Sequence, residues 1–131
     1  MTVDATEETW LQDLLAAIDV QDTAVFLNYL TPDAEFRFGS APPARGQPAI
    51  RAAVDGFFVS IRGSRHRLLN TWRGDKSLVC EGEVTYSRHD GSDVTLPFTN
   101  VFQMSGGLIA QYKIYIDIAP LYAGLPAPMP E

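Results

Sequence analysis

The sequence predicts an α+β fold, in which N-terminal helices pack on one face of a curved antiparallel sheet. Two observations favour this class. Apolar residues recur mainly at helical spacing before Gly63 and at alternate positions after it. Helices that precede a run of strands are typical of α+β proteins. The 131 residues fit a single domain, 1–131, in which we expect the proline-rich tail 124–131 to be loose.

Two helices are expected first. Asp4 and Glu7 have the spacing of a capping box, and the segment after them has apolar residues at helical spacing. These apolar residues are Trp10, Leu11, Leu14, Leu15 and Ile18. A second, short helix should begin at Asp22 and stop at Pro32, because proline lacks the N–H group that a helix interior requires.

A short strand, a loop and a third helix should follow. Ala34, Phe36 and Phe38 alternate with polar residues and indicate the strand, whereas glycine and proline predict a loop over 39–46. The third helix begins near Pro48, which is tolerated in a first helical turn. Its apolar face comprises Ile50, Ala53, Val54, Phe57, Phe58 and Ile61.

For the remainder of the chain the sequence predicts an antiparallel β-meander. Strands are expected at 65–73, 77–88, 93–104 and 108–118, where apolar residues alternate with polar ones. The segments 89–92 and 105–107 contain glycine and have the length of hairpin turns. We therefore expect these four strands to form a curved antiparallel sheet on which the helices pack.

Polar residues interrupt the inward faces of these strands. Asn100 is the one polar member of the apolar set on 94–104, and His66 and Asn70 share a set with Trp72. A single buried amide or imidazole is usually a hydrogen-bonded core group. Several such groups on one concave face instead indicate a ligand-binding pocket, which is the interpretation we favour.

Asp117 poses a separate question, because it lies in the apolar segment 114–120. Strict alternation directs it away from the isoleucines of this strand. It would reach the pocket if a β-bulge re-aims it, or if the polar set of the strand faces the pocket and the isoleucines face a dimer partner or a helix. In an apolar pocket, desolvation would raise the pKa of this carboxyl and make it a useful general base. Alternatively, Asp117 is a strand-end residue that bonds the backbone before Pro120. Both alternatives remain open at the level of the sequence.

Composition excludes some classes of function. A net charge of −6 disfavours nucleic-acid binding, and no run approaches the roughly 18 apolar residues that cross a membrane. We expect no secretory signal, and Cys80, the single cysteine, is expected to be buried and inert. These features favour a cytoplasmic protein. The two histidines, His66 and His89, form no evident metal-ligand set, so neither a metal nor another cofactor is expected.

Several segments, in this order, resemble the nuclear-transport-factor-2-like superfamily, and its SnoaL-like branch in particular. They are WLQDLLAAIDVQDTAVFLNYLTPDAEFRF, then ARGQPAIRAAVDGFF, then LPFTNVFQM with IYID near the end. The resemblance covers roughly residues 8–122 and implies a cone of helices and a bent sheet around one pocket. The superfamily includes polyketide cyclases, ketosteroid isomerases, epoxide hydrolases and non-catalytic binding modules, so the fold does not define the activity.

Two of these activities lack matching residues. By the resemblance, the tyrosine and the aspartate of ketosteroid isomerase fall on Leu14 and Phe38, which can neither donate nor accept a proton. Limonene epoxide hydrolase pairs a last-strand aspartate, here Asp117, with an Arg-x-Asp motif. That motif would fall near Glu83 and Thr85 and is absent. Epoxide hydrolysis is therefore the weaker alternative.

The SnoaL-like cyclases imply a cofactor-independent cyclase or isomerase, in which Asp117 removes a proton next to the carbonyl of an apolar compound. Asn100 or His66 would stabilise the enolate. Further residues are expected to bind the substrate: Trp10, Tyr29, Phe38, Phe57, Asn70, Trp72, Tyr86, Phe98, Phe102 and Tyr115. The alternative is a non-catalytic ligand-binding or interaction module. In either case we expect a homodimer, because the apolar sheet surface exceeds what the helices can cover.

Overall fold

A computed structural model describes residues 2–124, and this part of the chain forms helices on one side of a single sheet. The helices are α1 (Ala5–Asp19), α2 (Thr23–Leu27), α3 (Gln47–Ser60) and α4 (Ala119–Tyr122). The strands are β1 (Leu30–Phe38), β2 (Ala44–Arg45), β3 (Gly63–Arg73), β4 (Ser77–Ser87), β5 (Asp93–Ser105) and β6 (Leu108–Tyr115). Except for Gly124, the tail predicted at 124–131 lies outside the described residues.

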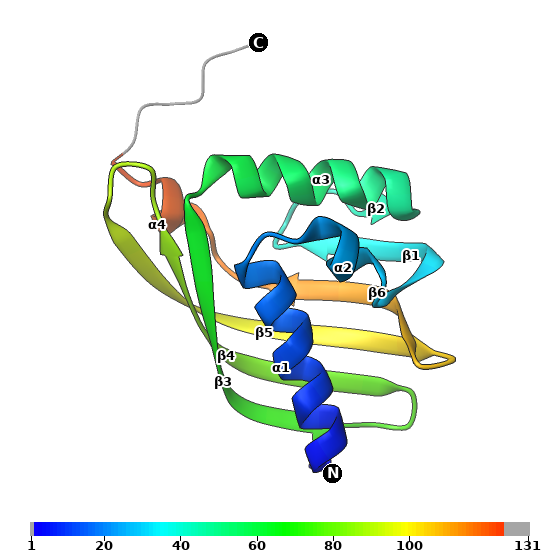
Figure 1. Cartoon of the computed structure of the whole chain (residues 1–131). Helices are drawn as coiled ribbons and strands as arrows, with labels where there is room; N and C mark the ends of the chain where they lie inside the picture. The colour runs from blue at the N-terminus through cyan, green and yellow to red at the C-terminus, as the bar shows by residue number, and fades with distance from the viewer. Residues whose placement is uncertain (1, 125–131) are drawn as a thin grey trace.

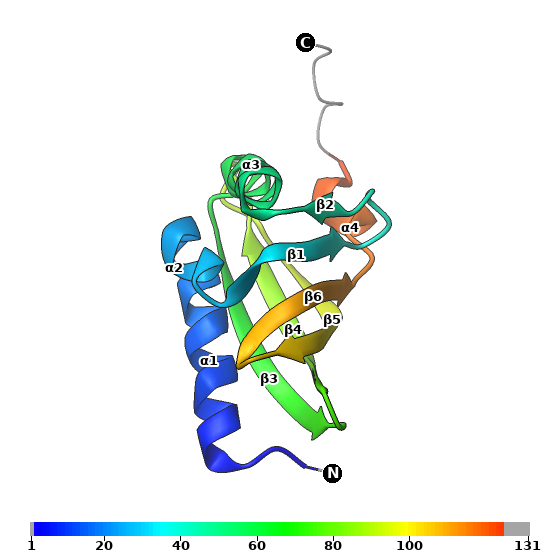
Figure 2. The same ribbon diagram turned by 90° about the vertical axis from the view of Figure 1, so that its right-hand side faces the viewer.

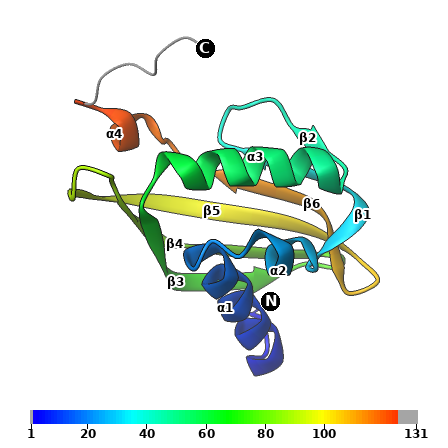
Figure 3. The same cartoon turned by 45° about the horizontal axis from the view of Figure 1, so that its top comes forward.

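The sheet has the strand order β2-β1-β6-β5-β4-β3. Neighbouring strands are antiparallel, except that β1 and β6 run parallel. Figures 1 and 2 show the strands curving around α1, α2 and α3, which lie on the same face of the sheet. The helix α3 packs against β1 and β2, whereas α1 packs against β3, near the opposite edge of the sheet (Figure 3). The α+β class and the curved sheet predicted from the sequence are confirmed.

The predicted helix-start signals are present in the structure. The side chain of Asp4 accepts a hydrogen bond from the backbone N–H of Glu7 at 2.8 Å, and the side chain of Glu7 accepts one from the backbone N–H of Asp4 at 3.1 Å. This capping box satisfies two N–H groups that a helix terminus otherwise leaves unpaired. Proline lies in the first turn of α3, at Pro48.

The second helix ends earlier than the sequence predicts, since α2 stops at Leu27 and Pro32 lies inside β1. Gln47 accounts for part of this difference, because its amide donates to the carbonyls of Leu27 and Leu30 at 3.3 and 3.2 Å. The pairing of β1 with β6 is irregular between Leu30 and Glu35. Proline is tolerated in such a stretch because no ladder hydrogen bond is lost there.

A β-bulge changes the direction of side chains on β3. Leu68 pairs with Gly82 and Asn70 pairs with Glu81, so Leu69 is an extra residue. Such an insertion reverses which face the following side chains occupy. Asn70 and Trp72 are therefore exposed, although simple alternation placed them inward with His66.

The end of the sheet also differs from the sequence prediction. The last strand stops at Tyr115 rather than at residue 118, and the chain then turns into α4. Pro120 favours this turn, because it lies in the first turn of α4, where its missing N–H costs nothing. Leu121 of α4 is buried against the core. Among residues 2–124, no helix is long and apolar enough to cross a membrane.

Candidate functional site

The concave face of the sheet and the helices enclose a cavity of about 230 Å³. Its wall is mainly apolar, and among the described residues that line it His66 is the single member of the set Asp, Glu, Lys, Arg and His. The residues that line it come from every helix except α4 and from five strands or their flanks: Ile18, Phe26, Phe36, Phe38, Ala41, Ala53, Val54, Phe57, Phe58, His66, Val84, Tyr86, Phe98, Asn100, Tyr112, Ile114 and Ile116. A small apolar ligand is the kind of molecule that such a cavity binds.

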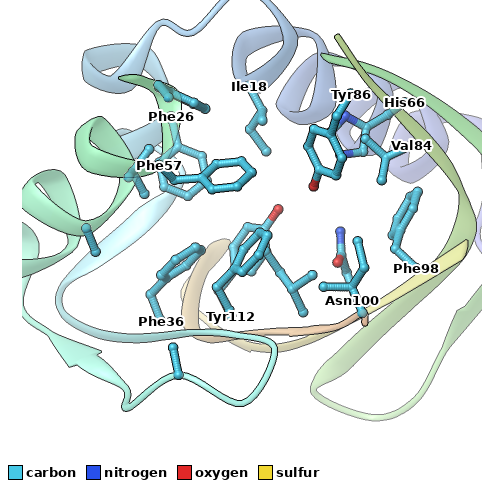
Figure 4. A pocket seen from close by; sticks show the side chains of 17 residues that line it. Ile18, Phe26, Phe36, Phe57, His66, Val84, Tyr86, Phe98, Asn100 and Tyr112 are labelled. Carbon is cyan, nitrogen blue, oxygen red and sulfur yellow. The ribbon is translucent and has the colours of Figure 1, made fainter. Parts of the chain in front are cut away.

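Polar groups enter this wall from four adjacent strands. His66 lies on β3, Tyr86 on β4, Asn100 on β5 and Tyr112 on β6. Figure 4 shows the two tyrosine hydroxyls and the Asn100 amide directed toward the middle of the cavity, with His66 beside Tyr86. The wall can therefore hydrogen-bond a polar atom of a ligand that is otherwise surrounded by apolar groups.

His66 is held by a carboxylate at the end of α1. Its ring Nδ1 lies 2.5 Å from Oδ1 of Asp19, and its backbone N–H donates to Oδ2 of the same residue at 2.9 Å. The Ser64 hydroxyl also donates to Asp19, at 2.8 Å. An ionised carboxylate only accepts, so the hydrogen of a neutral imidazole resides on Nδ1 and Nε2 keeps its lone pair. This arrangement orients a ring nitrogen that can take up a proton.

The environment of the histidine also restricts its motion. Phe98 packs edge-on against the imidazole, with ring centroids 5.2 Å apart. The side chains of His66 and Asp19 are 10% and 22% exposed. Contacts on both sides reduce the number of rotamers that the histidine can adopt, so its ring is preorganised for a ligand in the cavity.

Both tyrosines remain neutral in this apolar wall. Burial raises the pKa of Tyr86 well above its usual value, with smaller contributions from Tyr122 and Asp19. Burial also raises the pKa of Tyr112, and nearby Cys80 adds to the effect. A neutral phenol can donate a hydrogen bond, which a phenolate cannot. Near neutral pH, both hydroxyls are thus available as donors to a ligand oxygen.

Asp117 lies outside the cavity. Its side chain is exposed and accepts a hydrogen bond from the backbone N–H of Ala119 at 3.0 Å. This position corresponds to the strand-end alternative that the sequence left open. The β-bulge in β6 occurs at Ala110, seven residues earlier, so it does not turn Asp117 toward the isoleucines. Of the three residues expected to be catalytic, His66 and Asn100 line the cavity and Asp117 does not.

The other residues expected at the site fall into three groups. Phe38, Phe57, Tyr86 and Phe98 line the cavity together with His66 and Asn100. Trp10, Tyr29 and Phe102 do not line it. Phe102 is buried in the core, Trp10 and Tyr29 are partly buried against the core, and the Trp10 ring meets those of Tyr29 and Phe102 edge-on. Asn70, Trp72 and Tyr115 are exposed, and the bulge at Leu69 accounts for the first two.

The sequence reasoning missed Asp19 and did not assign Tyr112 to the site. Tyr112 shares strand parity with Ile114, so alternation alone could have placed it on the inner face. Asp19 carries no such signal, because it is an ordinary polar residue at a helix end. Its partner His66 is 47 residues away in the sequence, and only the packing of α1 on β3 brings the two together.

The family model for the SnoaL-like domain matches residues 11–112, and the chain belongs to this family. Among curated proteins, none is significantly similar to it in sequence. Solved structures show the same fold. An NTF2-like protein of unknown function from Burkholderia pseudomallei superimposes with a TM-score of 0.82 at 16% identity, over 95% of this chain and all (100%) of that one.

Two further solved structures are candidate polyketide cyclases. The one from Xanthomonas campestris has a TM-score of 0.77 at 19% identity and covers 86% of this chain and 91% of its own. The SnoaL-like one from Jannaschia sp. CCS1 has a TM-score of 0.76 at 16% identity, over 98% of this chain and 99% of its own. At these identities the likeness concerns the fold, and the activity has to be argued from the cavity.

Proposed function

We propose that this protein is a cofactor-independent acid–base enzyme that acts on an apolar carbonyl compound in the cavity. One observation carries the proposal: an imidazole held by a carboxylate lies in the wall of a mainly apolar cavity, together with an amide and two phenols. The resemblance to cyclases suggested an aspartate base on the last strand. Because Asp117 lies outside the cavity, we assign the base role to His66.

The proposed reaction begins with a proton transfer. Nε2 of His66 takes a proton from the carbon next to the carbonyl, and the electron pair of that C–H bond moves to form an enolate. Asp19 stabilises the imidazolium that results. If a C=C bond is conjugated with the enolate, return of the proton to the far carbon of that bond gives an isomer. Attack of the enolate carbon on a second carbonyl instead closes a ring, and the alkoxide that forms takes the proton back from the imidazolium. Both outcomes need no electron acceptor.

The enolate oxygen would be stabilised by hydrogen-bond donors from the wall. The Asn100 amide and the hydroxyls of Tyr86 and Tyr112 are directed toward the middle of the cavity. Donors fixed in a dry, apolar site stabilise a developing negative charge more than water does, because they need no reorganisation when the charge appears. The arrangement therefore supports chemistry that passes through an enolate.

Proton exchange on a simple ketone tests this proposal. In D₂O the wild-type protein should accelerate exchange of the α-protons of 2-tetralone, a neutral two-ring ketone, as followed by proton NMR. His66→Gln should lower the exchange rate by about 10²-fold or more, since it removes the base. Asp117→Asn is the matched control and should leave the rate unchanged, because this carboxylate is exposed and outside the cavity.

A third variant tests the role of Asp19. Asp19→Asn should also slow exchange, because an amide in place of the carboxylate no longer fixes the His66 tautomer or stabilises its protonated form. Nitrogen-15 NMR should show the change of tautomer directly. Equal exchange rates in wild type and His66→Gln, or a loss of exchange in Asp117→Asn, would contradict the assignment.

The alternative is a binding module of the same fold without catalysis. The observation that favours it is the exposed position of Asp117, the residue on which the resemblance to the catalytic relatives depended. In that case a ligand occupies the cavity, and no variant changes the rate of proton exchange. Epoxide hydrolysis has no supporting observation, since it required the same aspartate beside the ligand.

A further inference from the structure

The cavity contains an unsatisfied hydrogen-bond acceptor that the proposed proton transfer does not use. Asn100 is only 2% exposed, and within residues 2–124 its Oδ1 has no hydrogen-bond partner. An unpaired polar atom in the interior destabilises the fold unless a partner is supplied. Asn100 is also part of the cavity wall, with its amide directed inward. The missing partner can therefore come from a ligand.

A ligand hydroxyl is the group that fits this acceptor. The terminal torsion of asparagine is broad, and half a turn exchanges Oδ1 with Nδ2 at almost unchanged shape. In that orientation Oδ1 faces the cavity as an acceptor, and the hydroxyls of Tyr86 and Tyr112 remain as donors for the enolate oxygen. Oδ1 requires a donor, which an ether or a ketone lacks and a phenol or enol provides.

The volume of the cavity limits the size of the ligand. At about 230 Å³ it exceeds the roughly 150 Å³ of an engineered apolar cavity that holds benzene. It is smaller than the roughly 300 Å³ at which pockets for drug-sized molecules begin. One ring with substituents or two fused rings fit between these limits, whereas four fused rings do not.

The wall also selects for charge and shape. Apart from His66, no acidic or basic side chain belongs to it, so a charged ligand would lose its hydration without gaining a counter-ion. Phe36 and Tyr112 have ring centroids 5.3 Å apart, and those of Phe38 and Phe57 are 4.7 Å apart. These aromatic pairs provide flat surfaces against which a planar ring can pack.

We infer that the natural ligand is a neutral one- or two-ring compound with a phenolic or enolic hydroxyl that donates to Oδ1 of Asn100. The inference refines the proposed function, on which it rests for the use of this cavity as the active site. It extends that function because it names a recognition contact separate from the base.

A series of probes of graded chemistry tests the inference by isothermal titration calorimetry on the full chain. 2-Naphthol has two rings and a donor, 2-methoxynaphthalene has the same rings with an acceptor only, and 1-hydroxypyrene has the donor on four rings. Wild type should bind 2-naphthol at least about tenfold more tightly than the methyl ether, which corresponds to one hydrogen bond to a buried acceptor. It should show no binding of 1-hydroxypyrene.

Two variants complete the experiment. Asn100→Leu keeps the side-chain shape without the acceptor, so it should bind both two-ring probes with equal affinity. His66→Gln should keep the preference for 2-naphthol within about threefold, even though it loses proton exchange. Failure of the proposed catalysis is thereby distinguished from failure of the ligand assignment.

The outcomes that overturn the inference are equally defined. Equal affinity of wild type for 2-naphthol and its methyl ether removes the hydroxyl contact, and this comparison needs no variant to fold. Binding of 1-hydroxypyrene removes the size limit. If none of the two-ring probes binds, the neutral aromatic ligand class is wrong.

Discussion

At the residue scale, the site depends on side chains whose environment differs from what their neighbours in the sequence suggest. Asp19 ends a helix but binds the backbone and the ring of His66. Asp117 lies among isoleucines but is exposed at the end of a strand. The contacts of each carboxylate therefore depend on the element packed against it. Asp19 binds a residue of the cavity wall, whereas Asp117 is exposed outside the cavity.

Cys80 allows a prediction at this scale. It is fully buried, and desolvation raises the pKa of its thiol from 9.0 to about 12, with hydrogen bonds from Asn100 as a smaller opposing effect. Since the thiolate is the reactive form, native protein at pH 8 should react with an aromatic disulfide reagent far more slowly than protein unfolded in urea. Equal rates would show that the thiol is accessible.

The same shift predicts how stability depends on alkaline pH. The unfolded chain loses the Cys80 proton near pH 9, whereas the folded chain holds it up to about pH 12. The raised pKa values of Tyr86 and Tyr112 act in the same direction. The stabilisation is therefore complete below pH 9 and is lost as pH rises toward 12. Urea unfolding at pH 8 and pH 10.5 should give a lower free energy of unfolding at the higher pH.

At the scale of elements, a bulge and a glycine determine which side chains of β3 face the cavity. A Cβ atom on Gly82 would lie 1.9 Å from the carbonyl oxygen of Arg67 and 3.1 Å from Cα of Leu68. This contact is with backbone beside the bulge, so a side chain could be accommodated only if β3 and β4 moved apart. A glycine is thus needed at position 82, which pairs with Leu68 next to the β-bulge that reverses the direction of the following side chains of β3.

Substitution of Gly82 tests whether the close pairing of β3 and β4 beside the bulge requires glycine. Gly82→Ala should lower the free energy of unfolding by about 1–3 kcal/mol or more, because the strands must separate to admit the methyl group. Gly63→Ala is the matched control on β3, where an added Cβ meets nothing within 4 Å, and it should have little effect. Urea denaturation measures both. Equal stability of the two variants would mean that the strands adapt without cost.

The elements themselves were largely predictable from local patterns. The capping box at Asp4, the proline near the start of α3 and the period of two after residue 63 all correspond to observed boundaries. The errors occurred where pairing between distant strands overrides local preference. Pro32 was expected to stop a helix, but it lies in the irregular part of β1, where the absence of its N–H has no consequence.

At the scale of the whole molecule, the predicted homodimer stays a prediction. On the sheet face away from the helices, Trp72, Val79 and Val101 lie side by side across three strands, and Trp72 is 42% exposed. Tyr115 adds a further ring on β6 and is 58% exposed. An exposed apolar patch of this kind is a candidate for a two-fold interface between copies of the chain.

Sedimentation velocity at micromolar concentration measures the oligomeric state. The wild type is expected to sediment as a dimer, and Trp72→Glu should shift it toward monomer, because a charge in the centre of the interface would be desolvated. Glu8→Lys, an exposed charge change on α1, provides a control that should leave the dimer intact. A monomer in the wild type would contradict the prediction.

The fold class, the order of the elements and the concave face that contains His66 and Asn100 could be inferred from the sequence, because periodicity and capping residues act over a few neighbouring positions. The pairing of Asp19 with His66, the outward turn of Asn70 and Trp72, and the exposure of Asp117 required three-dimensional packing. These features depend on a helix end meeting a strand 47 residues later and on one inserted residue at Leu69. Contacts between residues so far apart in the sequence produce no periodic pattern of apolar and polar residues, so a single sequence does not reveal them.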